Sequence, residues 1–371
     1  MADEAQARTQ GAPSAPAAAP PVDPARVEVI APNFKRRLSG VTSTIVQLVP
    51  EQARDLGVAT LGPGLPASLP SLRWWQVPQL YRRPVGRPFR IWHARRNIEM
   101  IVGIVMRDIL RMPMRLVFTS AAQRHHKPFT KWLIRRMDEV VATSRISGSF
   151  LEIPHTVVMH GIDLARFRPP RDAEDAFAAA GLPGRYAVGC FGRIRHQKGT
   201  DLFVDAMIAL LPDHPEWTAI ITGRTTGRHA GFAAEQEEKI RQAGLEKRIL
   251  FLGEVPDIRV WYRRVSLCVA PSRNEGFGLT PLEAMASGAA VVASNAGAYR
   301  ELIAEGQTGT VVPAGDGDAL REAIRSYLAD PEATAGKGRA GIDHAAKNFP
   351  LQREAEGLAA IYERLWSGAA R

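Results

Sequence analysis

Cysteine is scarce in this chain of 371 residues, which contains only Cys190 and Cys268. Each lies in or beside an apolar run that is typical of a strand, so both thiols are expected in a hydrophobic core. Two such cysteines provide neither a disulfide framework nor a cluster of metal ligands. The scarcity fits a reducing cytoplasm and excludes the class of small secreted proteins held together by disulfides.

Long apolar runs are also lacking. No uncharged apolar stretch approaches the roughly 18–20 residues that a membrane-spanning helix needs. Residues 1–24 are rich in Ala, Pro and Gln, carry Asp3 and Glu4, and lack the apolar stretch of a signal peptide. We predict a disordered tail over residues 1–24 and a cytoplasmic protein that is soluble or peripheral to a membrane.

Acidic residues are rare in one part of the chain. Residues 73–137 contain fifteen Arg and Lys but only two acids, Glu99 and Asp108. The net charge of this segment, 15 minus 2 or +13, exceeds the +10 of the whole chain. Aromatic residues are interspersed with these cations. Such a surface can bind nucleic acid, lie on an anionic membrane, or hold a phosphorylated or carboxylated acceptor. No nucleic-acid-binding motif accompanies it, so we do not expect nucleic acid as a partner.

Apolar runs typical of strands alternate with amphipathic helical segments along the chain. In the second half we predict strands at 186–191, 218–222, 249–252 and 310–312, and helices at 301–305 and 331–348. This alternation predicts an α/β protein with parallel, doubly wound sheets. A stretch rich in Pro, Ala and Gly at residues 169–185 is the expected linker. We therefore predict an N-terminal domain at 25–168, a C-terminal domain at 186–348, and a final helical segment at 349–371.

The tract from Ala270 to Tyr299 is predicted to fold as strand, loop, helix and strand. Its loop contains Gly276 and Gly278, and Thr280 is a suitable N-cap for the helix that follows. Open α/β sheets bind ligands at the carboxyl ends of their strands. A helix N-terminus suits a phosphate, and glycine lets the backbone approach it closely. The tract therefore predicts a site for an anionic nucleotide.

Two carboxylates, Glu275 and Glu283, bracket this loop with seven residues between them. A glutamate beside a phosphate would repel it, so both are better explained as acceptors for sugar hydroxyls on either side of the phosphates. A structural interpretation stays open for each. Thr280 and Glu283 have the spacing of a capping box, in which the glutamate bonds back to the N-cap amide. Glu275 could be a solvated loop residue.

The run E-G-F-G-L-T-P-L-E-A-M-A-S-G, which begins at Glu275, resembles the paired-glutamate motif of retaining glycosyltransferases of family 4. The run C-F-G-R-I-R-H-Q-K-G, from Cys190 to Gly199, resembles the same family's arginine–lysine segment. The resemblance implies a GT-B architecture, with two Rossmann-like domains facing across a cleft. It implies that Arg193 and Lys198 hold the donor diphosphate and, with Glu275, act in catalysis. The implied donor-binding residues are Gly40, Gly192, Arg193, Lys198, Glu275, Gly276, Phe277, Gly278, Leu279, Thr280 and Glu283.

The sequence departs from this family at two places. The first β–α loop has the single Gly40 where the family has paired glycines. After the strand predicted at 115–119, Ser120 and Ala121 stand near the place of a histidine that faces the donor sugar. His125 and His126 follow a few residues later and are candidates for that catalytic role. Either could instead be structural or contact the acceptor.

Four tracts across Asn33–Trp366, among them W-H-A-R-R-N and F-T-S-A-A-Q-R-H-H, resemble the lipopolysaccharide core mannosyltransferases of alphaproteobacteria. This resemblance implies transfer of mannose from GDP-mannose to a Kdo sugar on a lipid A precursor at the inner membrane. No D-x-D motif lies near the site, and its two cations can neutralise the diphosphate, so neither a metal nor another cofactor is expected. Three alternatives stay open: a UDP-sugar transferase with another envelope acceptor, a UDP-sugar 2-epimerase, and a non-catalytic basic binding protein.

Overall fold

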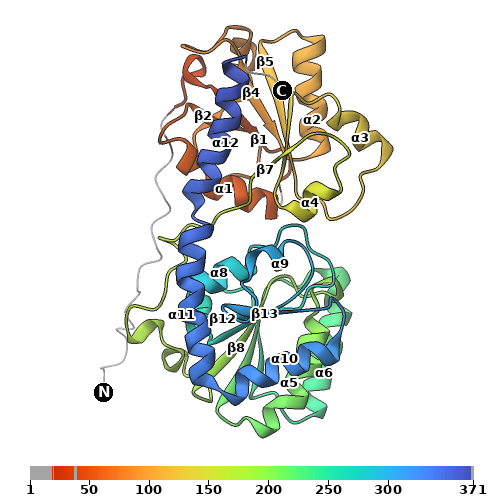
Figure 1. Ribbon diagram of the computed structural model, residues 1–371, viewed down its shortest axis with the longest axis vertical. Coiled ribbons are helices and arrows are strands. Elements are labelled where there is room, and N and C mark those ends of the chain that lie inside the picture. Colours follow the sequence, from red (N-terminus) through yellow and green to blue (C-terminus); the bar gives the residue numbers. More distant parts are fainter. Residues whose placement is uncertain (1–18, 20, 37–39, 369–371) are drawn as a thin grey trace, which may run out of the picture. The chain divides into compact units, whose positions relative to one another are not determined.

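The structure is a computed structural model that describes residues 19, 21–36 and 40–368. The chain folds into two compact units, Met1–Leu116 and Val117–Arg371. Two sheets of seven and six strands carry the fold, and the strand pairs in both are parallel (Figure 1). This confirms the predicted α/β class with doubly wound sheets. The predicted domain bounds stay a prediction, and most of the predicted tail lies outside the described residues.

In the first unit, β1 pairs in parallel with β2 and with β4. Every residue of these three strands is buried. Strands buried on both faces favour continuous apolar runs rather than alternation, as in the V-I-A-P of β1, although β4 also buries Arg90 and His93. The elements of this unit are η1 (Pro24–Arg26), β1 (Val29–Pro32), α1 (Gly40–Gln52), β2 (Val58–Leu61), β3 (Ser71–Leu72), η2 (Trp74–Tyr81), β4 (Arg90–Ala94), α2 (Asn97–Ile104) and the π-helical turn η3 (Val105–Ile109).

The side chain of Arg90 on β4 is completely buried and fixes an irregular part of this unit. Its guanidinium donates hydrogen bonds to the carbonyl oxygens of Leu80 at 3.1 Å and Pro24 at 2.8 Å, and also to that of Arg82. Burial lowers the pKa of this guanidinium from its usual value. One arginine thus satisfies three carbonyl groups of the neighbouring loops, including two at the end of η2.

Replacing Arg90 by methionine is expected to destabilise the first unit by several kcal/mol. The carbonyl groups of Leu80 and Arg82 would lose their donor, whereas that of Pro24 would keep the N–H of Val27 at 3.3 Å. A buried polar group without a partner costs about 1–3 kcal/mol. Thermal and urea unfolding would measure the loss, with Arg83→Met as the control because Arg83 is exposed. Equal stability of the two variants would show that water or another donor replaces the guanidinium.

The strand β5 (Met114–Ser120) contains the boundary between the units and is followed by β6 (Glu139–Ala142) and β7 (Thr156–Val157). The order in the larger sheet is β3-β2-β1-β4-β5-β6-β7. The short helices α3 (Pro128–Ile134) and α4 (Arg145–Ser149) lie between these strands in the chain. Ser144 caps α4 by accepting the Ser147 amide hydrogen at 2.9 Å.

The six-stranded sheet has the order β10-β9-β8-β11-β12-β13. Strand β8 therefore lies between β9 and β11, and the chain builds outward from it in both directions. Such a reversal of strand order leaves a crevice at the carboxyl ends of the two central strands. The strands are β8 (Tyr186–Phe191), β9 (Trp217–Thr222), β10 (Ile249–Gly253), β11 (Leu267–Ala270), β12 (Ala290–Ser294) and β13 (Gly309–Val312).

Helices cover both faces of this sheet (Figure 1). Side chains alternate along a strand, so neighbouring residues of β12 face the hydrophobic cores on the two sides of the sheet. Val291 packs with Leu282 and Met285 of α8, whereas Val292 packs with the buried residues of α5 and α10. The helices and turns are η4 (Ala173–Asp175), η5 (Phe177–Ala180), η6 (His196–Lys198), α5 (Thr200–Leu210), η7 (Leu211–Asp213), η8 (Gly227–His229), α6 (Ala230–Gln242), α7 (Ile258–Arg264), α8 (Thr280–Ala286), α9 (Tyr299–Leu302), α10 (Gly317–Ala329), α11 (Pro331–Asn348) and α12 (Leu351–Trp366). No described helix combines the length and the apolar character needed to cross a membrane.

Candidate active site

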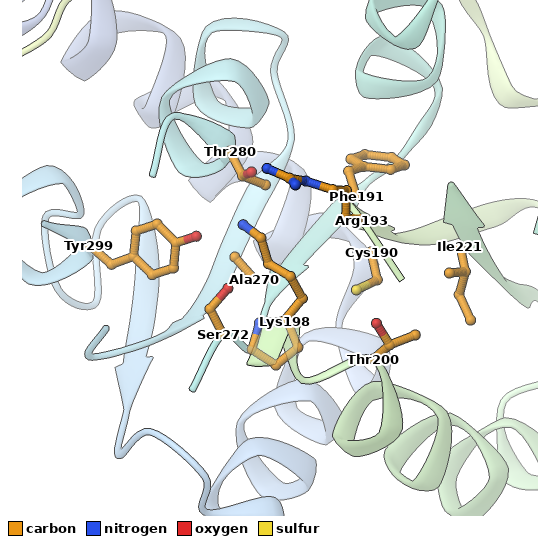
Figure 2. Close-up of a pocket in the computed structure, with 12 residues that line it drawn as sticks. Cys190, Phe191, Arg193, Lys198, Thr200, Ile221, Ala270, Ser272, Thr280 and Tyr299 are labelled. Atoms are coloured by element: carbon orange, nitrogen blue, oxygen red, sulfur yellow. The ribbon is translucent and has the colours of Figure 1, made fainter. Parts of the chain in front are cut away.

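A pocket lies where the carboxyl ends of β8 and β11 diverge, at the reversal of strand order (Figure 2). Arg193 and Lys198 both line it, so the structure brings together the two cations that the sequence predicted for a diphosphate. Gly192 and Thr280, two predicted donor-binding residues, also line it. The lining residues are Cys190, Phe191, Gly192, Arg193, Lys198, Thr200, Ile221, Ala270, Pro271, Ser272, Thr280 and Tyr299.

The loop that carries both cations is held by close backbone contacts. Gly199 has a φ of +70°, and a Cβ there would lie 2.0 Å from the carbonyl oxygen of Pro271. On the other side, a Cβ at Gly223 would lie 1.8 Å from the carbonyl oxygen of Gly192. Only glycine permits such approaches. The loop is therefore pressed between the ends of β9 and β11, which fixes the backbone beneath Lys198.

A partly buried ion pair ties this loop to the loop that follows β11. Arg273 donates to both carboxylate oxygens of Asp201, at 2.7 and 2.8 Å, and to the carbonyl oxygen of His196 at 2.7 Å. The backbone N–H of Arg273 donates to the carbonyl oxygen of Gln197 at 2.9 Å. Burial acts to raise the pKa of Asp201, but the hydrogen bonds from Arg273 outweigh it and hold the pKa below its usual value. The sequence gave no indication that these two residues would pair.

Asp201→Asn is expected to cost about 1.5–3 kcal/mol of stability at neutral pH, the usual contribution of hydrogen bonds to a charged group. Because the pKa of Asp201 is lowered on folding, the stabilisation is present above about pH 4 and is lost as the pH falls further. The difference in unfolding free energy between wild type and variant should therefore shrink below about pH 4.

Unfolding curves between neutral and acid pH would measure this difference. Asp205→Asn is the matched control, since Asp205 lies on the same helix in an ion pair with Lys239 and its side chain is 55% exposed. That exposed pair is expected to contribute about 0–1 kcal/mol. A loss in Asp201→Asn that does not change with pH would show that packing, rather than the ion pair, carries the stabilisation.

Glu275 lies directly against one of the two cations. Its Oε2 forms an ion pair with the Lys198 ammonium, and its Oε1 accepts the backbone N–H of Gly276 at 3.1 Å. The exposed fractions of the two paired side chains are 19% for Lys198 and 18% for Glu275. Glu275 is therefore no freely solvated loop residue, and a donor that uses both side chains must redistribute their interactions.

Glu283 does not form the capping box that its spacing with Thr280 allows. The N-cap of α8 is Leu279, with a helical backbone and no side-chain hydrogen bond, and Thr280 is the first helical residue. The Glu283 carboxylate instead accepts the hydroxyl hydrogen of Tyr262 at 2.6 Å. Predicting Thr280 as the N-cap was therefore wrong, because the chain already turns helically at Leu279.

The remaining predicted residues of the loop differ in what they can offer a ligand. The Phe277 side chain is 5% exposed and belongs to the hydrophobic core, so its backbone is the part available. Gly278 has a φ of +85°, and a Cβ there would lie 2.3 Å from Cε1 of Tyr299. Gly278 is thus required by the packing of Tyr299, in addition to any close approach of a ligand. Gly276 and Leu279 are partly exposed.

The two candidate histidines lie apart from the lining of this pocket. Nε2 of His126 is 3.1 Å from Oγ of Ser120, and burial followed by nearby Arg124 lowers the pKa of His126. His126 lines a second pocket with Lys131 and other residues between 131 and 153. The His125 side chain is 69% exposed. A catalytic role for either histidine stays a prediction.

Gly40 belongs to the first unit and begins α1. It is exposed, its φ is not positive, and a Cβ there would meet nothing within 4 Å. Packing within the unit therefore does not require glycine at this position. Its predicted contact with the donor stays a prediction.

Tyr299 is a pocket residue that the sequence motifs did not single out. Its side chain is 1% exposed, and burial followed by the charge of Glu275 raises its pKa well above the usual value. Ser272 and Thr200 also line the pocket. The sequence could have indicated both as pocket residues, because Ser272 follows β11 and Thr200 begins α5. Among the described residues, no three His, Cys, Asp or Glu side chains form a group suited to a metal ion.

Comparison with known proteins identifies the family. A family model described as "Glycosyl transferases group 1" matches residues 185–330. The lipopolysaccharide core biosynthesis mannosyltransferase LpcC of Rhizobium leguminosarum bv. viciae is 64% identical over 340 residues, which cover 91% of this chain and 97% of the relative. The chain belongs to the group 1 glycosyltransferases. It is therefore an enzyme that transfers glycosyl groups, as the two sequence motifs predicted.

Within this family, similarity to a second lipopolysaccharide enzyme also extends over nearly the whole chain. The lipopolysaccharide core biosynthesis mannosyltransferase LpsB of Rhizobium meliloti (strain 1021) is 55% identical over 349 residues, 93% of this chain and 99% of the relative. Together with LpcC, it places the chain among the lipopolysaccharide core mannosyltransferases. This confirms the resemblance predicted from the four sequence tracts.

Solved structures confirm the GT-B fold. The Anabaena protein HepE in complex with UDP and glucose superposes with a TM-score of 0.77 at 20% identity, covering 91% of this chain and 99% of that one. Sucrose-phosphate synthase from Thermosynechococcus elongatus also gives a TM-score of 0.77, at 21% identity and with coverage of 92% and 100%. Similarity at these identities establishes the fold alone.

Proposed function

We propose that this enzyme transfers mannose from GDP-mannose to a Kdo sugar of a lipid A-linked core precursor. The observation that carries the proposal is the 64% identity with LpcC over 91% of the chain. The pocket supports it, because Arg193 and Lys198 line one space that suits a diphosphate. GDP as the nucleotide and Kdo as the acceptor sugar rest on the sequence resemblance.

In the proposed reaction, Arg193 and Lys198 stabilise the negative charge that develops on the departing GDP. Both cations already line the pocket, and Lys198 becomes available to the diphosphate when the donor displaces Glu275 from its ion pair. Glu275 orients the mannose through its hydroxyl groups, and Glu283 accepts the ribose hydroxyls. The acceptor hydroxyl attacks from the face that GDP leaves, so the anomeric configuration is retained.

The acceptor proposed here is anionic and lipid-linked, and the first unit offers a matching surface. Trp74, Trp75 and Tyr81 are 59%, 67% and 51% exposed. The arginines at 73, 82 and 83 are exposed in the same segment. Interfacial aromatic rings and cations favour an anionic membrane surface, where each cation contributes about 1 kcal/mol. We infer that the enzyme works at the cytoplasmic face of the inner membrane as a peripheral protein.

Transfer from labelled GDP-mannose to Kdo-bearing lipid A in anionic vesicles tests the proposed reaction. The matched controls are lipid A without Kdo and UDP-glucose as the donor. Mannosylation that requires both GDP-mannose and Kdo supports the proposal. Transfer from the UDP-sugar alone would contradict mannose as the substrate while leaving a glycosyltransferase. Conversion of a UDP-sugar to its 2-epimer in the absence of acceptor would favour the epimerase alternative.

Vesicle sedimentation tests the proposed membrane surface independently of catalysis. The enzyme should bind vesicles that contain phosphatidylglycerol and should release as salt screens the charges. Equal binding to neutral phosphatidylcholine vesicles would contradict an electrostatic role for the arginines. If the enzyme binds neither kind of vesicle, the proposed membrane surface is wrong, and the arginines would instead contact the soluble part of the acceptor.

A further inference from the structure

The hydroxyl of Tyr262 on α7 holds one oxygen of the Glu283 carboxylate. The phenol O–H donates to Oε2 at 2.6 Å. The Tyr262 side chain is only 2% exposed, and its ring packs edge-on against two phenylalanine rings. The distance between ring centroids is 4.6 Å to Phe191 and 5.8 Å to Phe167. Because the ring is held from two sides, its hydroxyl has little freedom to move. The hydrogen bond therefore fixes the orientation of the carboxylate.

The second oxygen of Glu283 has different surroundings. Among the described residues, Oε1 accepts no hydrogen bond, and the side chain is only partly buried. Glu283 therefore offers one oxygen to a ligand while the other is held by Tyr262. Burial raises the pKa of Glu283, whereas the Tyr262 hydrogen bond and the charge of Lys198 act to lower it. The Tyr262 hydroxyl thus also supports the ionised, accepting form of the carboxylate.

Tyr262 adjoins the pocket without lining it. Phe191, which packs on the Tyr262 ring, lines the pocket, and so does Thr280, which lies on α8 three residues before Glu283. The phenol is therefore buried behind the wall of the pocket. It can affect a ligand there through Glu283, but it cannot touch the ligand directly.

We propose that Tyr262 is a positioning residue that orients Glu283 to accept hydrogen bonds from the vicinal hydroxyl groups of the donor's ribose. This proposal rests on the proposed function in one respect, the assignment of Glu283 to the ribose. It adds the origin of selectivity for ribonucleotides over deoxyribonucleotides. A carboxylate with one fixed oxygen presents the other in a single direction, so less conformational freedom is lost when a diol binds.

Binding of nucleotides with and without ribose hydroxyls to wild type and Tyr262→Phe tests the proposal. The probes are GDP and UDP, each compared with its 2′,3′-dideoxy counterpart by calorimetry. Wild type should prefer the ribonucleotide at least about tenfold, as expected for a hydrogen bond to a charged group. Tyr262→Phe should bind the ribonucleotide several-fold more weakly and the dideoxynucleotide unchanged, so that the preference largely disappears.

Tyr327→Phe provides the matched control. Tyr327 on α10 is 3% exposed, and its hydroxyl is hydrogen-bonded to Oγ1 of Thr310 on β13 at 2.9 Å; neither residue lines the pocket. It loses the same hydroxyl group from a buried site, so it reports the effect of lower stability alone. The preference for the ribonucleotide should remain at the wild-type value in this variant.

Three outcomes separate the proposal from its premises. Equal weakening of ribonucleotide and dideoxynucleotide binding in Tyr262→Phe would overturn the positioning role and leave Tyr262 as a core residue. A wild type that does not distinguish the two would overturn both the assignment of Glu283 to the ribose and the role of Tyr262. A preference for UDP over GDP would contradict only the proposed donor base, because the comparison is then made on the uridine pair.

Discussion

Glu275→Gln is expected to bind GDP about tenfold more tightly than wild type while mannose transfer falls at least about a hundredfold. The two effects have opposite directions because the affinity concerns the complex with GDP, whereas the rate concerns the transition state of mannose transfer. Glu275 forms an ion pair with Lys198. A diphosphate that binds Lys198 competes with this carboxylate and is repelled by its charge. Glutamine keeps the shape of the side chain but removes its charge, so the Lys198 ammonium can bind the diphosphate without competition from a carboxylate.

The loss of transfer follows from the proposed role of Glu275 towards the sugar. A carboxylate accepts hydrogen bonds from sugar hydroxyls more strongly than an amide oxygen does. Removal of one preorganised electrostatic partner of a reacting group typically costs about 10²–10³ in rate. The measurements are calorimetric titration with GDP and the initial rate with GDP-mannose, both at low salt, where the repulsion is least screened.

Glu237→Gln makes the same change of charge on the exposed surface of α6 and serves as the control. It should leave both GDP affinity and transfer near the wild-type values. If Glu275→Gln binds GDP no more tightly than this control, Lys198 does not take part in diphosphate binding or Glu275 does not restrain it. If transfer persists, Glu275 has no part in the mechanism.

Gly278→Ala is expected to lower donor binding and transfer by about a hundredfold and to destabilise the second unit by more than about 2 kcal/mol. The φ of Gly278 is +85°, which costs an alanine about 1–2 kcal/mol. In addition, the new Cβ would lie 2.3 Å from Cε1 of Tyr299 and 2.8 Å from Cγ of Glu275. Relief of these contacts requires the side chains of Tyr299, which lines the pocket, and of Glu275, which pairs with Lys198, to move.

Gly306→Ala separates backbone strain from the steric clash. Gly306 has a φ of +74°, and a Cβ there would meet nothing within 4 Å. This variant should therefore lose about 1–2 kcal/mol of stability and keep the wild-type affinity for GDP-mannose. Thermal unfolding and donor titration of the two variants give the comparison. Wild-type donor affinity in Gly278→Ala would show that the positions of Glu275 and Tyr299 do not control binding.

The sequence predicted most of the six-stranded sheet because its strands are short apolar runs between turns. Tyr186–Phe191 was predicted with the bounds that β8 has, and Pro331–Asn348 with those of α11. The helix predicted at 301–305 instead forms as α9 at Tyr299–Leu302. Short helices shift easily, since a single turn has few internal hydrogen bonds and its position depends on packing.

Two elements that support the site and the basic surface were not predicted. Helix α7 (Ile258–Arg264) contains three arginines and follows Asp257, so its apolar face is narrow. The 3-10 segment η2 (Trp74–Tyr81) contains Pro78 and lacks helical periodicity. Each is stabilised by contacts that are distant in the sequence. Tyr262 could not be selected as a site residue because its partner, Glu283, lies beyond the next strand.

The sequence by itself determined the family, the fold class and the chemical types at the site. The spacing of Arg193, Lys198, Glu275 and Glu283 within strand–loop–helix segments is local information, and local segments place such residues at the same edge of a parallel sheet. Tertiary structure alone decided which partner each charge has. Glu283 bonds to Tyr262 rather than to its own helix, and Lys198 pairs with Glu275. The physical reason is that hydrogen bonds and ion pairs require contact within about 3 Å, and only the packed sheet and helices bring these distant residues so close.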